Sequence, residues 1–106
     1  MTRDEVQQIA LQIVAYAGSA FDYFNKAIEL AEDNRLGEAE ESLKRGEAEL
    51  HEAHNAQTDL LAAEAGQKEI PFSIIMVHAQ DHLTMAIFAE RMTKHFITLW
   101  RKEYVK

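Results

Sequence analysis

Two histidines and an aspartate lie within five consecutive residues, in the segment "HAQDH" at positions 78–82. On a helix, His78 and His82 are four positions apart and therefore face the same way. Such a pair can chelate one metal ion. Alternatively, one imidazole reacts as a nucleophile while the other supports it, and a phosphorylated histidine is a reactive carrier because its P–N bond transfers readily. The spacing alone leaves both chemistries open.

Asp81 lies at the centre of an apolar stripe, if each helical residue turns the chain by about 100°. The other members of the stripe, all within about 60° of Asp81, are Ile74, Val77, Met85, Phe88, Met92, Phe96 and Leu99. An isolated carboxylate in such a stripe is costly unless it is protonated, paired or bound to a metal. In an oligomer wound around this stripe, copies of Asp81 would converge, and Mg²⁺ is their natural neutraliser.

These residues belong to the last of three helices that the apolar periodicity predicts. The helices are expected at about residues 3–32, 37–65 and 71–104, with a turn at 33–35. Gly66 suits the C-terminal cap of the second helix, and Pro71 suits the first turn of the third, where its missing N–H costs little. No segment has a strand pattern. The sequence therefore predicts an all-α fold, a single antiparallel three-helix domain over residues 1–106.

The third expected helix is apolar on nearly every side. Met76, Leu83 and Ile87 lie on the side away from the Asp81 stripe. A helix of this kind must be covered from several directions. Two partner helices from one chain of 106 residues could hardly do so, and we therefore expect an oligomer packed around the third helix.

Charge and composition disfavour several classes of function. The net charge of −7 argues against nucleic acid and anionic lipid, because both reward clustered Lys and Arg. The chain has no cysteine, so it has no thiolate chemistry of its own. Its first residues lack a signal-peptide pattern, and its longest stretch without charge, residues 6–21, is too short to span a bilayer. We expect a cytoplasmic protein.

The second expected helix offers weaker candidates. His51 and His54 lack the H-E-x-x-H spacing of zinc proteases, and the chain has no Glu-x-x-His of the ferritin-like di-iron bundles. His54 and Gln57 fall along the apolar stripe of this helix, where polar groups need partners. They either line a site or form hydrogen bonds between helices.

Three motifs in order, "IVAYAGSA", "EAHNAQTDLL" and "MVHAQDHL", resemble the lactose/cellobiose-type IIA components of the bacterial phosphoenolpyruvate-dependent sugar phosphotransferase system. The resemblance covers essentially the whole chain. It implies a homotrimer of three-helix subunits, nine helices in all, which agrees with the oligomer expected above. The chain departs from the usual pattern at Phe21, where many members have Arg, and at Thr84-Met85.

The resemblance also implies a role for each residue of the "HAQDH" segment. His78 matches the histidine that accepts a phosphoryl group from the carrier protein HPr and passes it to a cysteine of the IIB component. Asp81 matches the aspartate whose three copies bind one divalent metal ion, commonly Mg²⁺. Gln80 and His82 would support the phosphorylated imidazole by hydrogen bonding. The relay would drive uptake of a β-disaccharide such as lactose, cellobiose or chitobiose, and it would reach the membrane only through the IIC transporter.

Two other functions remain open at this point. One is a scaffolding bundle whose "HAQDH" segment only binds a metal at an oligomer axis, without any covalent phosphate. The other is a regulatory relative that is phosphorylated but signals to a different protein.

Overall fold

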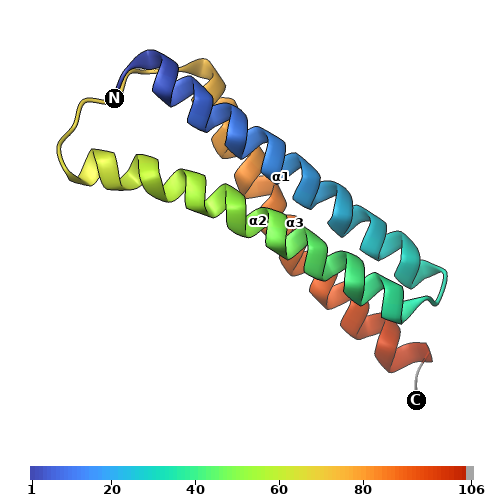
Figure 1. Ribbon diagram of the computed structural model, residues 1–106. Coiled ribbons are helices and arrows are strands. Elements are labelled where there is room, and N and C mark those ends of the chain that lie inside the picture. The colour runs from blue at the N-terminus through green and yellow to red at the C-terminus, as the bar shows by residue number, and fades with distance from the viewer. Residues whose placement is uncertain (105–106) are drawn as a thin grey trace.

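The computed structural model describes residues 1–104 and consists of three long helices joined by two short connections. Helix α1 spans Arg3–Glu32, α2 spans Leu36–Ala65 and α3 spans Ile74–Tyr104. Successive helices run in opposite directions (Figure 1), and the Cα trace measures 55 × 19 × 17 Å along its principal axes. No strand occurs in this part of the chain. The predicted all-α, antiparallel three-helix bundle is confirmed.

Helix α1 begins and ends where the sequence predicts. The Thr2 hydroxyl accepts a hydrogen bond from the Glu5 N–H at 3.1 Å, and the Glu5 carboxylate accepts one from the Thr2 N–H at 3.4 Å. This reciprocal capping box satisfies N–H groups that have no partner within the helix. At the other end, Asn34 takes a φ of 60°, a left-handed conformation that asparagine tolerates better than most residues. The predicted turn at residues 33–35 is confirmed.

Helix α2 ends at Ala65, as predicted, but Gly66 is not the residue that adopts the left-handed conformation. Gly66 has a φ of −79°, and the following residue, Gln67, has a φ of 61°. The Lys68 N–H then donates to the Ala63 carbonyl at 3.1 Å, which satisfies one of the last carbonyls of the helix. The capping position of Gly66 therefore makes no use of glycine's conformational freedom.

Helix α3 begins three residues after Pro71. The Ser73 hydroxyl accepts a hydrogen bond from the Met76 N–H at 3.4 Å, and the Ser73 carbonyl accepts one from the Val77 N–H at 3.2 Å. These bonds place Ser73 at the N-cap, where a serine side chain stabilises the non-helical backbone that precedes a helix. The prediction that Pro71 lies in the first turn of α3 is therefore wrong.

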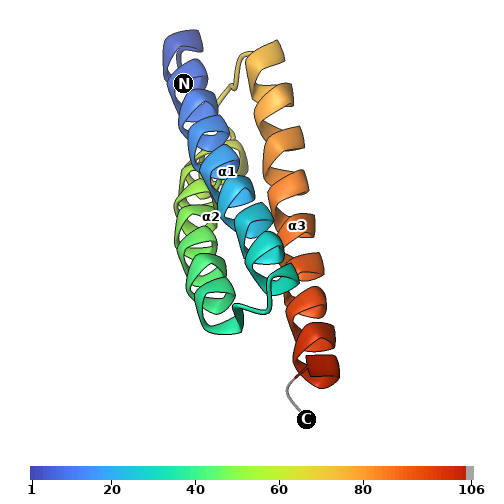
Figure 2. The same ribbon diagram turned by 90° about the vertical axis from the view of Figure 1, so that its right-hand side faces the viewer.

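The core contains many small side chains, which come from all three helices, and α1 lies at its centre. Helix α1 contributes half of the buried alanines. This helix packs extensively against both α2 and α3, whereas α2 and α3 contact each other less (Figure 2). Ile13, Phe24 and Leu83 are among the largest fully buried side chains of the core. The buried alanines are Ala10, Ala17, Ala20, Ala27, Ala31, Ala39, Ala53, Ala56, Ala79 and Ala86. Because alanine has a small side chain, the three helix axes can approach closely.

Polar pairs connect α2 to α3 along the seam between them. The pairs are Gln57–Gln80, Glu47–Lys94 and Glu40–Arg101. Residues later in α3 pair with residues earlier in α2, as antiparallel neighbours must. Within residues 1–104, no helix combines the length and the apolar character that crossing a membrane requires.

Candidate functional site

The histidine pair lies on the outer side of α3. The Nε2 atoms of His78 and His82 are 3.0 Å apart, and the two rings meet edge to face, with centroids 4.4 Å apart and an interplanar angle of 78°. This contact follows from their four-residue spacing on one helix. One Nε2 must carry a hydrogen and donate it, while the other must offer its lone pair.

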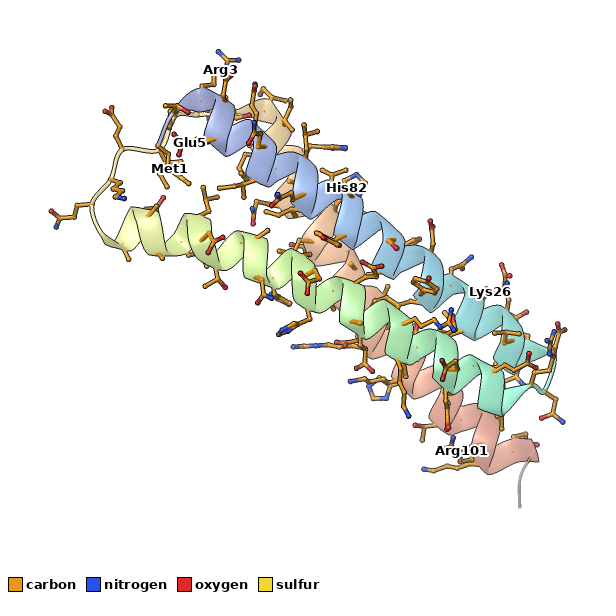
Figure 3. All side chains as sticks on the ribbon, viewed as in Figure 1. Met1, Arg3, Glu5, Lys26, His82 and Arg101 are labelled. Carbon is orange, nitrogen blue, oxygen red and sulfur yellow. The ribbon has the colours of Figure 1, made fainter. Side chains whose placement is uncertain are left out.

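The two histidines differ in their surroundings. His78 is exposed, whereas His82 is half-buried. Figure 3 labels His82 beside α1. His82 lines a pocket of about 270 Å³ together with Ala17, Gly18, Phe21, Asp22 and Met85. The exposed imidazole is open to a reacting partner, and the half-buried one is held by its neighbours. Of the two imidazoles, that of His78 is therefore the more accessible to another molecule.

The pocket beside His82 was not predicted from the sequence. Phe21 and Met85 give it apolar walls, while Asp22 contributes a carboxylate. Phe21 is one of the positions at which the chain departs from the pattern of the family it resembles, so this position brings a phenyl ring and no cation to the pocket beside His82. The α1 segment "GSAFD" at residues 18–22 gave no signal by itself, because only the packing of α1 on α3 brings it to His82.

Gln80 lies on a different side of α3 from His78. Its side-chain carbonyl accepts a hydrogen bond from Gln57 Nε2 on α2, and its amide donates to Met76 Sδ at 3.4 Å. Residues two positions apart on a helix are separated by about 200° around its axis. Gln80 therefore faces α2 when His78 faces outward. Within one chain, the Gln80 side chain therefore points away from the His78 imidazole, and the predicted support of His78 by Gln80 stays a prediction. The expectation that Gln57 forms a hydrogen bond between helices is confirmed.

Asp81 lies in the middle of a broad apolar surface that the single chain leaves uncovered. It is exposed, and so are Val77 at 50%, Met85 at 55% and Phe88 at 62% of their full accessible areas. The opposite side of α3, with Ala79, faces the core. Residues 1–104 of one chain contain no group of three His, Cys, Asp or Glu side chains placed to hold a metal ion.

Glu90 and Lys94, both on α3, have shifted pKa values. Partial burial, together with the neighbouring Glu47 carboxylate, raises the pKa of Glu90 above its ordinary value. A hydrogen bond to Glu47, whose carboxylate lies 3.0 Å from the Lys94 ammonium, raises the pKa of Lys94. At 1.5 Å of rise per residue, Glu90 is about 20 Å along α3 from His78. This cluster therefore belongs to the α2–α3 seam and not to the histidine site.

Comparison with known proteins identifies the family. Residues 8–101 match the family described as "PTS system, Lactose/Cellobiose specific IIA subunit". The chain belongs to this family. It is accordingly a IIA component of a sugar phosphotransferase system, of the lactose/cellobiose type.

Individual relatives of this IIA component share both sequence and fold. The lactose-specific EIIA component of Staphylococcus epidermidis is 41% identical over 102 residues, which cover 96% of this chain and 98% of the relative. The crystal structure of the cellobiose-specific enzyme IIA from Bacillus anthracis is 32% identical, with a TM-score of 0.92 over 100% of this chain and 95% of its own. The Escherichia coli IIA(chitobiose), solved in complex with HPr, is 26% identical, with a TM-score of 0.78 over 92% of this chain and 94% of its own.

Proposed function

We propose that this IIA component is the phosphocarrier of a β-disaccharide uptake system and that His78 carries the phosphoryl group. The observation that supports this assignment most directly is the exposed His78 imidazole, whose Nε2 contacts the Nε2 of the half-buried His82. Transfer between two carrier proteins needs a nucleophile that both can reach, held on a rigid element. A histidine on the outer side of a long packed helix meets this need.

Each transfer forms one bond to phosphorus and breaks another. The lone pair of His78 Nε2 attacks the donor's phosphoryl group, a P–N bond forms, and the bond from phosphorus to the donor breaks with its electron pair returning to the donor. A cysteine thiolate of the IIB component then attacks the phosphorus, and the P–N bond returns its electron pair to His78. The His82 Nε2–H donates to the His78 lone pair before transfer and to a phosphoryl oxygen afterwards.

The donor is HPr and the acceptor is the IIB component, both acting in the cytoplasm. The E. coli relative was solved in complex with HPr, which supports this donor. The acceptor must supply the thiol, because this chain contains no cysteine. Since the chain carries a net charge of −7, both partners bring complementary positive surfaces to a site that receives an anionic phosphoryl group.

The working form is a homotrimer wound around α3, nine helices in all. The uncovered apolar residues on both sides of Asp81 support this assembly, because soluble monomers rarely leave a contiguous apolar surface of this extent in water. Around a threefold axis, three Asp81 carboxylates provide the oxygen ligands that Mg²⁺ prefers. A bound ion would neutralise three converging negative charges and would hold the subunits together. It takes no part in phosphoryl transfer.

The decisive test is the intact mass of the protein after incubation with phosphoenolpyruvate, enzyme I and HPr. We expect one acid-labile phosphate on the wild type and none on His78→Ala. His51→Ala, which removes an exposed histidine from α2, is the matched control and should still be phosphorylated. A His78→Ala protein that accepts phosphate would overturn the site assignment. Absence of any mass shift in the wild type, with HPr shown to be phosphorylated, would favour a scaffolding bundle.

A further inference from the structure

We propose that Gln57 is a positioning residue for His78 and that it acts through Gln80. The inference rests on the proposed phosphocarrier function and extends it to a residue of α2 that does not touch the histidine pair. Gln57 Nε2 donates to the Gln80 side-chain carbonyl, and the Gln80 amide donates to Met76 Sδ at 3.4 Å. A chain of polar contacts thus connects α2 to the first turns of α3, where His78 lies.

This contact ties the rotation of α3 about its own axis to α2. At about 100° per residue, Gln80 and His82 project to opposite sides of Asp81, each about 100° away from it. When Gln57 holds Gln80 against α2, His82 is turned toward α1, where it lines the pocket with Ala17 and Gly18. His78 is then left at the outer edge of this α1-facing side. One hydrogen bond on the α2 side therefore orients the imidazoles on the α1 side.

Core packing also restrains α3 near this turn, because Leu83, one turn after Ala79, is a fully buried side chain. The buried residue between His78 and Gln80 is Ala79, whose single methyl group interlocks weakly with neighbouring helices. Helix α3 starts only at Ile74, after a non-helical connection. The first two turns of α3, which precede Leu83, are therefore restrained by small or half-buried core residues together with the Gln57–Gln80 bond.

The other polar pairs across the seam are too distant to fill this role. Lys94, which pairs with Glu47, is 14 residues beyond Gln80, or about 20 Å along the helix. Arg101, which pairs with Glu40, lies at one end of the bundle, whereas His82 lies nearer the middle (Figure 3). Across the part of the chain that the structure describes, the Gln57–Gln80 bond is the α2–α3 hydrogen bond or ion pair nearest to His78.

Loss of the Gln57 amide would act on both Gln80 and the helix that carries it. The Gln80 carbonyl, half-buried in the seam, would be left without its donor, and an unpaired buried carbonyl carries a free-energy penalty. A small local rotation of this turn of α3, enough to give the carbonyl another partner, would relieve that penalty. The same rotation would change how His78 and His82 meet.

The test compares Gln57→Met with Glu47→Gln in single-turnover phosphoryl transfer from phosphorylated HPr. Methionine keeps the length of glutamine but donates no hydrogen bond, while Glu47→Gln weakens the same seam far from the histidines. We expect Gln57→Met to lower the maximal transfer rate roughly ten- to a hundredfold, the range for small misplacement of a reacting group, with little change in the half-saturating HPr concentration. Glu47→Gln should transfer at the wild-type rate. Imidazole NMR shifts of His78 and His82 should move in Gln57→Met only.

Several outcomes would overturn the inference. If Gln57→Met transfers at the same rate as Glu47→Gln, or loses only apparent affinity for HPr, Gln57 does not position His78. Gln57→Asn, which retracts the amide by one methylene, provides the same comparison should Gln57→Met fail to fold. If the wild type itself accepts no phosphate, the proposed function fails, and the imidazole shifts still decide whether Gln57 orients the histidine pair.

Discussion

Gly46 of α2 lies directly against the aromatic ring of Phe24 on α1. A Cβ atom at position 46 would lie 2.5 Å from Phe24 Cε1 and 3.1 Å from the Ala20 carbonyl oxygen. Real Cβ atoms essentially never come that close to another heavy atom, so any side chain here must displace a fully buried ring. The absence of a side chain at this position allows α1 and α2 to approach.

Gly46→Ala should therefore destabilise the bundle. Overpacking of a filled core costs about 1–3 kcal/mol, while alanine favours the helix by about 1 kcal/mol relative to glycine. Gly18→Ala on α1 is the matched control, because a Cβ there meets nothing within 4 Å. The free energy of unfolding, measured in urea, should differ between the two variants by about the overpacking cost. Equal stability of the two variants would show that Phe24 moves aside without cost.

Glu90→Gln should stabilise the protein at neutral pH. Partial burial and the Glu47 carboxylate raise the pKa of Glu90 above its ordinary value of 4.5, so the folded state binds the Glu90 proton more tightly than the unfolded state does. As the pH rises from 4.5 through the raised pKa, the ionised carboxylate increasingly destabilises the fold. Glutamine removes this charge, and Lys94 keeps Glu47 as its partner at 3.0 Å.

The measurement for Glu90 is thermal unfolding at pH 4 and pH 7. Glu90→Gln should raise the melting temperature above that of the wild type at pH 7 and change it little at pH 4. Glu38→Gln should do the opposite at pH 7, because a hydrogen bond from Arg35 lowers the pKa of Glu38, and that stabilising effect is present above pH 4.5 and is lost on acidification. A gain of equal size at both pH values for Glu90→Gln would contradict the assigned cause.

His82→Ala should slow phosphoryl acceptance without abolishing it. The His82 imidazole contacts His78 at 3.0 Å, and a hydrogen bond to a charged group contributes about 1.5–3 kcal/mol, which corresponds to a rate loss of roughly ten- to a hundredfold. Intact-mass spectra should still show one phosphate after a longer incubation. His51→Ala serves again as the control, with the wild-type rate expected. A complete loss of phosphate in His82→Ala would instead assign the reacting group to His82.

Sequence periodicity predicted the three helices because each has a continuous buried face, but it could not predict how they rotate against one another. The pairing of Gln57 with Gln80 depends on the register and rotation of α2 against α3. Helical geometry already separates Gln80 from His78 by about 200°; the expectation that Gln80 supports His78 came from the family motif. The start of α3 was missed because Pro71 and Ser73 both suit a helix start, and the hydrogen bonds of Ser73 decide between them.

The exposed stripe around Asp81 was predictable in one respect and not in another. Its residues were expected from the sequence to be too numerous for one chain to cover, and Val77 and Phe88 are indeed exposed. The buried side of α3 uses smaller residues, such as Ala79 and Ala86. Hydrophobicity alone would have placed the larger side chains in the core, so only the packing of α3 on α1 and α2 shows which face remains free.

Asp81→Leu should keep the protein trimeric and make it insensitive to divalent metal. The substitution replaces an ionised group in an apolar surface with a residue that suits it, a change that is often neutral or stabilising by about 1–4 kcal/mol. Mg²⁺ should raise the melting temperature of the wild type, and a chelator should lower it, while neither should affect Asp81→Leu. Asp59→Leu, at an exposed position on α2, should keep the metal response. Light scattering that shows Asp81→Leu as a monomer would mean that the bound ion is required for assembly, whereas a metal response in this variant would place the ion elsewhere.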